Sequence, residues 1–210
     1  MRHRAGLLLI GLTAGPMPAM AQSAALRLGV SNVRAEQIAP ITGTRFRDGM
    51  AWSLDGAVGY RFATLGIRYL EGSLTGDDPS ANGDLVEGEA ILWLAPLRWA
   101  ALGVGRHLRS YVQGGGTEAW RFWEIRGRGR ARLTGALDAY AELWTVLGST
   151  LPGGASLDRG MGMEGGLRLA LGRLPASGHL RYRVERLDVG DGARRETVEQ
   201  FGIAVGIGRR

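Results

Sequence analysis

Four arginines occupy every second position between Arg126 and Arg132, and this alternation constrains the fold more than any other feature of the chain. The positions between them hold Gly127, Gly129 and Ala131. Successive side chains of a β-strand point to opposite faces. A strand here would therefore carry guanidinium groups on one face and small uncharged groups on the other. The segment predicts a strand whose two faces meet very different surroundings.

A hairpin with the next segment gives each of these arginines a partner, provided that residues 134–136 form a short loop. A shift of this register by one residue would move charge to both faces of the hairpin, so the register is well defined. It predicts two ion pairs and two cation–π contacts on one face. The predicted pairs are Arg132 with Asp138, Arg130 with Tyr140, Arg128 with Glu142, and Arg126 with Trp144.

The same alternation recurs along the chain, whereas helix caps followed by a helical period are hard to find among its 35 glycines. We therefore predict an all-β fold, an antiparallel up-and-down transmembrane β-barrel of about ten strands, with eight as the alternative. The predicted strands cover approximately 25–33, 50–62, 64–73, 85–95, 99–112, 118–133, 137–148, 159–172, 178–188 and 196–208.

The connections alternate between long and short, as they do in outer-membrane barrels. Polar or glycine-rich stretches at 34–49, 74–84, 113–117, 149–158 and 189–195 are read as long loops at one end. An arginine facing hydrocarbon costs about 2–4 kcal/mol at mid-depth, so the arginines should line the lumen. The predicted lumen ion network comprises Arg126, Arg128, Arg130, Arg132, Asp138, Glu142, Glu164, Arg168, Arg181 and Arg183.

Aromatic residues near the strand ends predict two belts at the membrane interfaces. One belt would hold Trp52, Trp120, Phe122, Trp123 and Phe201, and the other would hold Tyr60, Phe62 and Trp99.

The N-terminus has the order of a secretory signal: basic Arg2 and Arg4, the apolar stretch 5–13, and small residues around Met20. We expect residues 1–21 to be a cleaved signal peptide and residues 22–210 to form a single barrel domain. The absence of cysteine fits an exported chain that does not rely on disulfides.

Residues 24–210 resemble small bacterial outer-membrane β-barrel proteins as a class, through this pattern of strands, loops and aromatics. The resemblance implies a porin-like protein of the Gram-negative cell outer membrane, in contact with outer-membrane lipid and with the barrel-assembly machinery. A monomer is expected. The chain departs from the class by ending in Arg209 and Arg210 rather than in an aromatic residue.

The formal charge of +6 and the pI near 10.6 would usually suggest a nucleic-acid partner. An exported chain rarely meets nucleic acid, and these arginines alternate with apolar residues instead of clustering on a helix. We therefore expect no nucleic-acid partner. The sequence contains no zinc-ligand spacing or phosphate-binding turn and identifies no ligand, so we expect no metal or cofactor.

The leading hypothesis is a barrel with a charge-paired, largely filled, arginine-rich lumen. It would be a structural or surface-interaction protein or a narrow pore, and catalysis is not expected. One alternative is an outer-membrane hydrolase that uses Glu87 and His107, which face each other if Leu94 pairs with Ala100. No nucleophile is specified beside that dyad. Another alternative is a soluble periplasmic, lipocalin-like carrier of an apolar ligand, with the two faces inverted.

Overall fold

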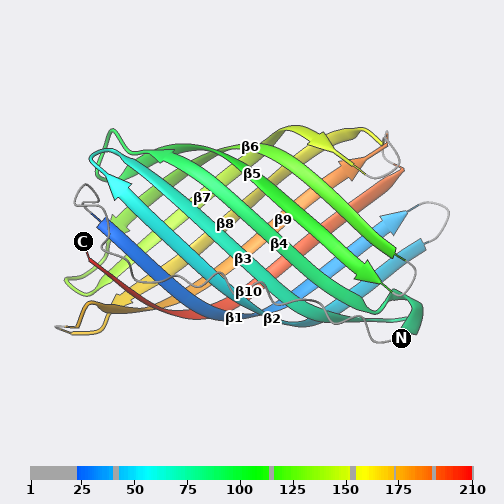
Figure 1. Ribbon diagram of the computed structural model, residues 1–210, viewed down its shortest axis with the longest axis horizontal. Helices are drawn as coiled ribbons and strands as arrows, with labels where there is room; N and C mark the ends of the chain where they lie inside the picture. Colours follow the sequence, from blue (N-terminus) through cyan, green and yellow to red (C-terminus); the bar gives the residue numbers. More distant parts are fainter. Residues whose placement is uncertain are drawn as a thin grey trace.

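The computed structural model describes residues 23–39, 43–113, 116–151, 155–172, 174–190 and 193–209, and these form a closed antiparallel barrel (Figure 1). Ten strands follow one another around the ring in chain order, and β1 pairs with both β2 and β10. The strands are β1 (Ser23–Ala39), β2 (Gly43–Tyr60), β3 (Ala63–Gly76), β4 (Gly83–Leu94), β5 (Ala100–Gln113), β6 (Gly116–Arg132), β7 (Leu137–Thr150), β8 (Leu157–Ala170), β9 (Ala176–Val189) and β10 (Arg194–Arg209).

The predicted all-β, up-and-down barrel is confirmed with ten strands, and the eight-stranded alternative is wrong. A turn of 3-10 helix, Pro79–Ala81, lies between β3 and β4. Within the described part of the chain, no helix has the length and apolar character needed to cross a membrane. The predicted signal peptide, residues 1–21, lies outside the described residues.

We call the end where β1 begins and β10 ends the proximal end; it lies on the left in Figure 1. The hairpins that join β1 to β2, β3 to β4, β5 to β6, β7 to β8 and β9 to β10 lie at the opposite, distal end. The predicted long distal loops are wrong, because the strands continue through most of these stretches. Residues 34–39, for example, pair with β2 as far as Ala39 opposite Gly43.

In the proximal part of the wall, large apolar side chains point outward and charged side chains point inward. Ile203 is 57 % exposed on the outer face, whereas Arg126 on the inner face is only 2 % exposed. The alternative with inverted faces is therefore wrong for this part of the barrel. Exposed apolar residues of the proximal wall include Leu28, Val30, Leu65, Ile67, Leu102, Val104, Leu143, Leu169, Ile203 and Val205.

In the distal part of the wall, this sorting of side chains reverses. Charged residues such as Arg34, Asp84, Arg121 and Arg186 are exposed. Their sequence neighbours Val33, Leu85, Phe122 and Leu187 point inward and are buried. The distal wall thus carries charge on its outer face around a partly apolar interior. Ala35, Leu74, Leu151, Leu157 and Val189 come from stretches that were read as loops, whereas the other apolar members of this interior lie in predicted strands.

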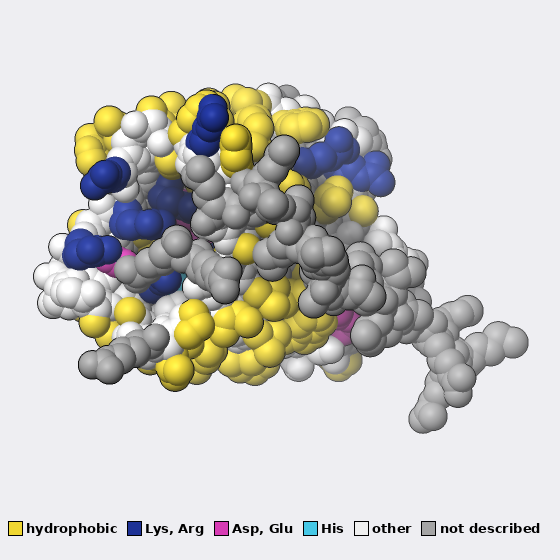
Figure 2. Space-filling model, turned by 60° about the vertical axis from the view of Figure 1, so that its left-hand side comes forward, with side chains coloured by type: hydrophobic (Ala, Val, Ile, Leu, Met, Phe, Trp, Pro, Cys, Tyr) yellow, Lys and Arg dark blue, Asp and Glu magenta, His cyan; other side chains and the backbone are white. Residues whose placement is uncertain are grey.

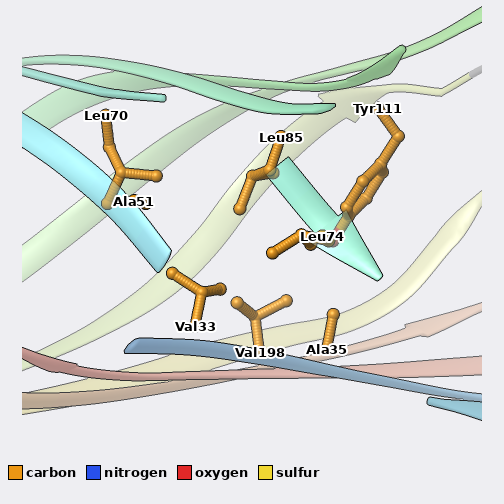
Figure 3. Packing of buried hydrophobic residues seen from close by; sticks show 8 residues of the cluster. All are labelled: Val33, Ala35, Ala51, Leu70, Leu74, Leu85, Tyr111 and Val198. Carbon is orange, nitrogen blue, oxygen red and sulfur yellow. The ribbon is translucent and has the colours of Figure 1, made fainter. Parts of the chain in front are cut away.

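Two apolar clusters fill the distal lumen. The first lies between β1, β2, β3, β4, β5 and β10, where its side chains converge from opposite walls (Figure 3). It comprises Val33, Ala35, Ala51, Leu70, Leu74, Leu85, Tyr111 and Val198. The second comprises Trp120, Phe122, Leu151, Leu187 and Val189, with Val146 and Leu157 packed against it.

The predicted aromatic belts are therefore only partly correct. Trp120 and Phe122 belong to the second apolar cluster and are each 1 % exposed, because even-numbered residues of β6 face inward. The remaining members of the predicted belts are exposed: Trp52, Trp123 and Phe201 toward the distal side, and Tyr60, Phe62 and Trp99 at the proximal end.

Candidate functional site

The β6–β7 hairpin pairs in the register that the sequence predicts, from Arg132 opposite Asp138 to Arg126 opposite Trp144. Arg132 Nε lies 3.2 Å from Asp138 Oδ1. Arg128 Nη2 lies 2.6 Å from Glu142 Oε1. These two ion pairs anchor one side of the lumen.

The aromatic partners of the arginine row differ in part from the prediction. The Arg126 guanidinium lies 4.5 Å from the centroid of the Trp144 ring, as expected. Arg128, besides its predicted pair with Glu142, also stacks on Trp93 of β4, at 3.9 Å. The Tyr140 hydroxyl, which was expected to meet Arg130, donates a hydrogen bond of 2.8 Å to Glu164.

A buried layer of charge centred on Arg109 crosses the middle of the lumen. Arg109 Nε donates to Glu87 Oε1 at 2.6 Å, and its Nη1 donates to Glu196 Oε1 at 3.3 Å. Its Nη2 donates to Glu185 Oε2. Each of these four side chains is at most 3 % exposed. One guanidinium is therefore shared by three carboxylates that would be very costly to bury alone, and Glu196 is also paired with Arg194 Nη2 at 3.2 Å.

Beside this layer, Glu89 is shared by two guanidinium groups. Arg126 Nη2 lies 2.6 Å and Arg183 Nη1 lies 3.0 Å from Glu89 Oε2. Arg126 and Arg183 both lie over the Trp144 ring, at 4.5 and 4.6 Å from its centroid. The indole Nε1 of Trp144 donates to Glu185 at 3.0 Å, which connects this group to the Arg109 layer.

Several of these ion pairs span the full width of the barrel. Arg183 on β9 and Glu89 on β4 lie on strands five places apart in the ring of ten. The pairs Arg109–Glu196 and Arg68–Glu164 join strands that are equally distant. Hydrogen bonds between neighbouring strands close the wall, and these cross-lumen pairs tie opposite walls together.

Inward-facing glycines make room for the aromatic rings of this layer. A Cβ at Gly162 on β8 would overlap the indole of Trp144. A Cβ at Gly166 would approach Tyr140 Cε1 to 2.5 Å. Rings from β7 therefore lie flat over the glycines of β8, where a larger residue would displace them.

The candidate dyad of Glu87 and His107 forms in a different way from the prediction. Leu94 pairs with Leu102 and not with Ala100, so Glu87 lies opposite Arg109. A shift of two residues keeps the same faces, which is why the alternation did not reveal it. His107 Nε2 is still 3.8 Å from Glu87 Oε1, but both side chains are buried within the charged layer. A substrate would have no access to them.

Glu89, His107 and Glu124 place their ligand atoms within 4.8 Å of one another, as in many metal sites. However, Arg126 Nη2 lies 2.6 Å from both Glu89 and Glu124. A bound cation would have to displace this guanidinium from both carboxylates. The geometry therefore favours an internal ion pair at this position.

Proximal to the charged layer, the lumen widens into a vestibule of about 550 Å³. Figure 2 shows arginine side chains gathered around this hollow, with hydrophobic side chains on the outer wall beside it. The charged residues that line the vestibule are Arg27, Arg68, Arg98, Arg128, Arg130, Arg132, Arg168, Asp55, Glu89, Asp138, Glu142 and Glu164.

The predicted lumen network is thus divided between two places. Arg128, Arg130, Arg132, Arg168, Asp138, Glu142 and Glu164 line the vestibule, whereas Arg126, Arg181 and Arg183 are buried behind its floor. Sequence reasoning missed Arg27, Arg98, Trp93 and His179 in the vestibule, and Glu196 and Gln200 in the charged layer. The inward alternation of β4 and β10 could have identified Trp93, Glu196 and Gln200, but the partners of these residues lie on distant strands.

Neither family models nor curated proteins match this chain. Among solved structures, the outer membrane protease OmpT from Escherichia coli aligns with a TM-score of 0.52 at 10 % identity, over 89 % of this chain and 95 % of that one. Neisserial surface protein A aligns with a TM-score of 0.41 at 12 % identity, over 87 % and 97 %. The translocator domain of the autotransporter NalP from Neisseria meningitidis aligns with a TM-score of 0.45 at 12 % identity, over 87 % and 88 %. The similarity to OmpT concerns the fold alone.

Proposed function

We propose that the chain is an outer-membrane β-barrel that does not conduct, and that it serves as a structural and surface-interaction protein. Its proximal wall would lie in the bilayer, and its distal wall would project into the external medium. The observation that carries this proposal is the reversal of side-chain polarity along the strands. A wall that is apolar outside at one end and charged outside at the other fits a barrel that passes from lipid into water.

The exposed aromatic residues support this placement in the bilayer. On β10, Phe201 separates the apolar outer residue Ile203 from the charged outer residue Glu199. Trp123 on β6 separates Ile125 from Arg121 in the same way. Aromatic side chains favour the interface between hydrocarbon and water. Tyr60, Phe62 and Trp99 would mark the opposite interface at the proximal end.

The length of the strands agrees with a wall that extends beyond the bilayer. Strands such as β1 and β2 have 17 and 18 residues. At about 3.4 Å per residue and a tilt near 40–45°, they rise roughly 40 Å along the axis. The hydrocarbon-facing band of an outer-membrane barrel is about 25 Å tall. With the proximal end in the periplasm, roughly the distal third of the wall would stand outside the membrane.

The filled lumen supports a closed barrel over a narrow pore. The Arg109 layer crosses its middle, and the two apolar clusters occupy its distal part. An ion would have to cross both regions. The partners in this proposal are outer-membrane lipid and the barrel-assembly machinery during insertion, and the barrel would function as a monomer.

Planar-bilayer recording on the refolded protein tests this proposal, after insertion has been verified by carbonate extraction and heat-modifiable gel mobility. We expect an inserted, heat-modifiable protein that produces no current steps. Reproducible steps would show an open pore and overturn the closed-barrel proposal. Release of the protein by carbonate would overturn its placement in the membrane.

A further inference from the structure

We propose that the proximal vestibule binds a small soluble organic anion that carries two or more acidic groups, carboxylate or phosphate. This inference goes beyond the proposed structural role, because it assigns a ligand to the end of the barrel opposite the projecting wall. The observation that supports it is a surplus of arginine at the open, proximal side of the vestibule, here called its mouth, where Arg98 and Arg130 are exposed. The acids at its inner side, here called its floor, are already ion-paired: Asp55, Glu89, Glu142 and Glu164.

The acidic groups at the floor already have cationic partners. Arg68 Nε lies 2.8 Å from the Asp55 carboxylate, and Arg181 Nη1 lies 3.2 Å from it. Arg68 Nη2 lies 3.0 Å from Glu164 Oε2. Glu89 and Glu142 are held by the arginines described above. Arg181, Arg126 and Arg183 contribute from behind the floor, so the carboxylates need no cation from the mouth.

The arginines at the mouth have fewer acidic partners than the acids at the floor have basic ones. Among the described residues, neither Arg98 nor Arg130 has an ion-pair or hydrogen-bond partner for its side chain. Arg27 only approaches Asp55, at 3.9 Å. Seven arginines and five carboxylates line the vestibule, which leaves a formal charge of +2. Behind it, the buried Arg109, Arg126, Arg181 and Arg183 are matched in number by the buried Glu87, Glu124, Glu185 and Glu196. The vestibule therefore attracts anions.

The spacing of these arginines suggests a ligand with more than one acidic group. Arg130 and Arg132 project from alternate positions of the same strand, so their Cα atoms are about 7 Å apart. Each planar guanidinium can hold one carboxylate or phosphate through two parallel hydrogen bonds. A ligand with two acidic groups could therefore engage Arg130 with one group and the terminal nitrogens of Arg132, whose Nε is held by Asp138, with the other.

The vestibule is also partly preorganised and of suitable size. Arg128 is fixed between the Trp93 ring and Glu142, so it loses little side-chain freedom when an anion binds next to it. Ile91 and the Trp93 ring supply apolar surface in the wall. A volume of about 550 Å³ falls within the usual range for small-molecule sites.

Isothermal titration of the full chain in an uncharged detergent tests this proposal, with citrate and pyrophosphate as soluble probes and acetate as the monovalent comparison. We expect saturable binding of at least one multivalent probe, binding that weakens as NaCl is raised, and much weaker binding of acetate. Arg130→Gln should raise the dissociation constant of the multivalent probe by about tenfold or more, because a charge-assisted hydrogen-bonding partner is removed.

Arg121→Gln is the matched control, because Arg121 lies on the same strand but is exposed on the distal outer wall. It should leave binding unchanged. Heat-modifiable mobility establishes that each variant remains a folded barrel. The proposal is overturned if a folded wild-type protein binds neither probe, or if Arg121→Gln weakens binding as much as Arg130→Gln. Binding of short-chain phosphatidylglycerol without binding of either soluble probe would also overturn it, in favour of a lipid headgroup site. None of these outcomes bears on conductance, which tests the closed barrel separately.

Discussion

Arg183 on β9 and Glu89 on β4 lie on opposite sides of the barrel, and Nη1 of the arginine is 3.0 Å from Oε2 of the glutamate. The arginine is 2 % exposed and the glutamate 8 % exposed. Removing two charges from water is costly, and their attraction offsets this cost only when the geometry is good and the remaining polar groups are satisfied. Arg183 Nε and Nη2 are buried without a hydrogen-bond partner among the described residues, so this pair contributes more to specifying which inward residues meet across the lumen than to stability.

Arg109→Met should be the most damaging single change in the charged layer. It leaves Glu87, Glu185 and Glu196 without the guanidinium that all three contact. Loss of one partner from a buried ion pair typically costs about 3–5 kcal/mol, and three carboxylates are affected here. Urea unfolding in lipid vesicles, followed by tryptophan fluorescence, measures the loss. Arg121→Met, on the exposed distal wall, should have little effect, and equal losses for the two variants would contradict a structural role of the layer.

Gly162→Ala should destabilise the barrel although it adds only one methyl group. The new Cβ would overlap the Trp144 indole, which lies beneath two guanidinium groups and donates to Glu185. Overpacking of this kind typically costs about 1–3 kcal/mol. The temperature at which heat-modifiable mobility is lost reports the change. At Gly88 a Cβ would meet nothing within 4 Å, so Gly88→Ala should behave like the wild type. A stable Gly162→Ala variant would mean that the ring can move aside without cost.

Two substitutions on the outer face of β10 locate the edge of the membrane. Ile203→Arg should cost about 2–4 kcal/mol, because it places a guanidinium against hydrocarbon. Thr197→Arg, on the same face but distal to Phe201, should cost at most about 1 kcal/mol. Unfolding of both variants in vesicles gives the comparison. Equal costs at the two positions would show that the boundary does not lie near Phe201.

Leu70→Ala tests whether the distal apolar clusters behave as a true core. Leu70 is completely buried in the first cluster, so its truncation should cost about 2–5 kcal/mol through lost burial and a residual cavity. Leu147→Ala removes the same atoms from a side chain that is 63 % exposed, and should cost much less. Equilibrium unfolding of the two variants distinguishes these outcomes. We also expect Leu70→Ala to remain non-conducting, because the Arg109 layer still crosses the lumen.

The alternation of side chains was sufficient to predict the closed β-barrel, the inward direction of the arginine row, and the register of β6 with β7. The register of β6 with β7 could be predicted because any shift by one residue would have put charge on both faces of the hairpin. The register of β4 with β5 could not be predicted from the sequence. Leu94 can pair with Ala100 or Leu102 without exchanging the faces, so the local pattern is equally well satisfied.

The polar stretches at the distal end were misread as loops for a related reason. An alternation such as that of Arg34 with Ala35, within the stretch read as a loop, fits a strand, but it does not say which face meets lipid, water or the barrel interior. The same is true of Trp120 and Phe122, whose size favoured an interface and whose position on β6 buried them. The reversal of polarity becomes visible only when inner and outer faces are assigned along whole strands.

The sequence by itself determined which residues share a face of each strand, because the period of a strand is a property of the local backbone. Only the tertiary structure decided which inward residues meet, because contacts such as Arg183 with Glu89 depend on strand number and stagger around the closed ring. The surplus of arginine at the vestibule mouth follows from those contacts. Asp55, Glu89 and Glu164 of the vestibule are neutralised from distant strands by Arg181, Arg183 and Arg68, and no local pattern records these contacts.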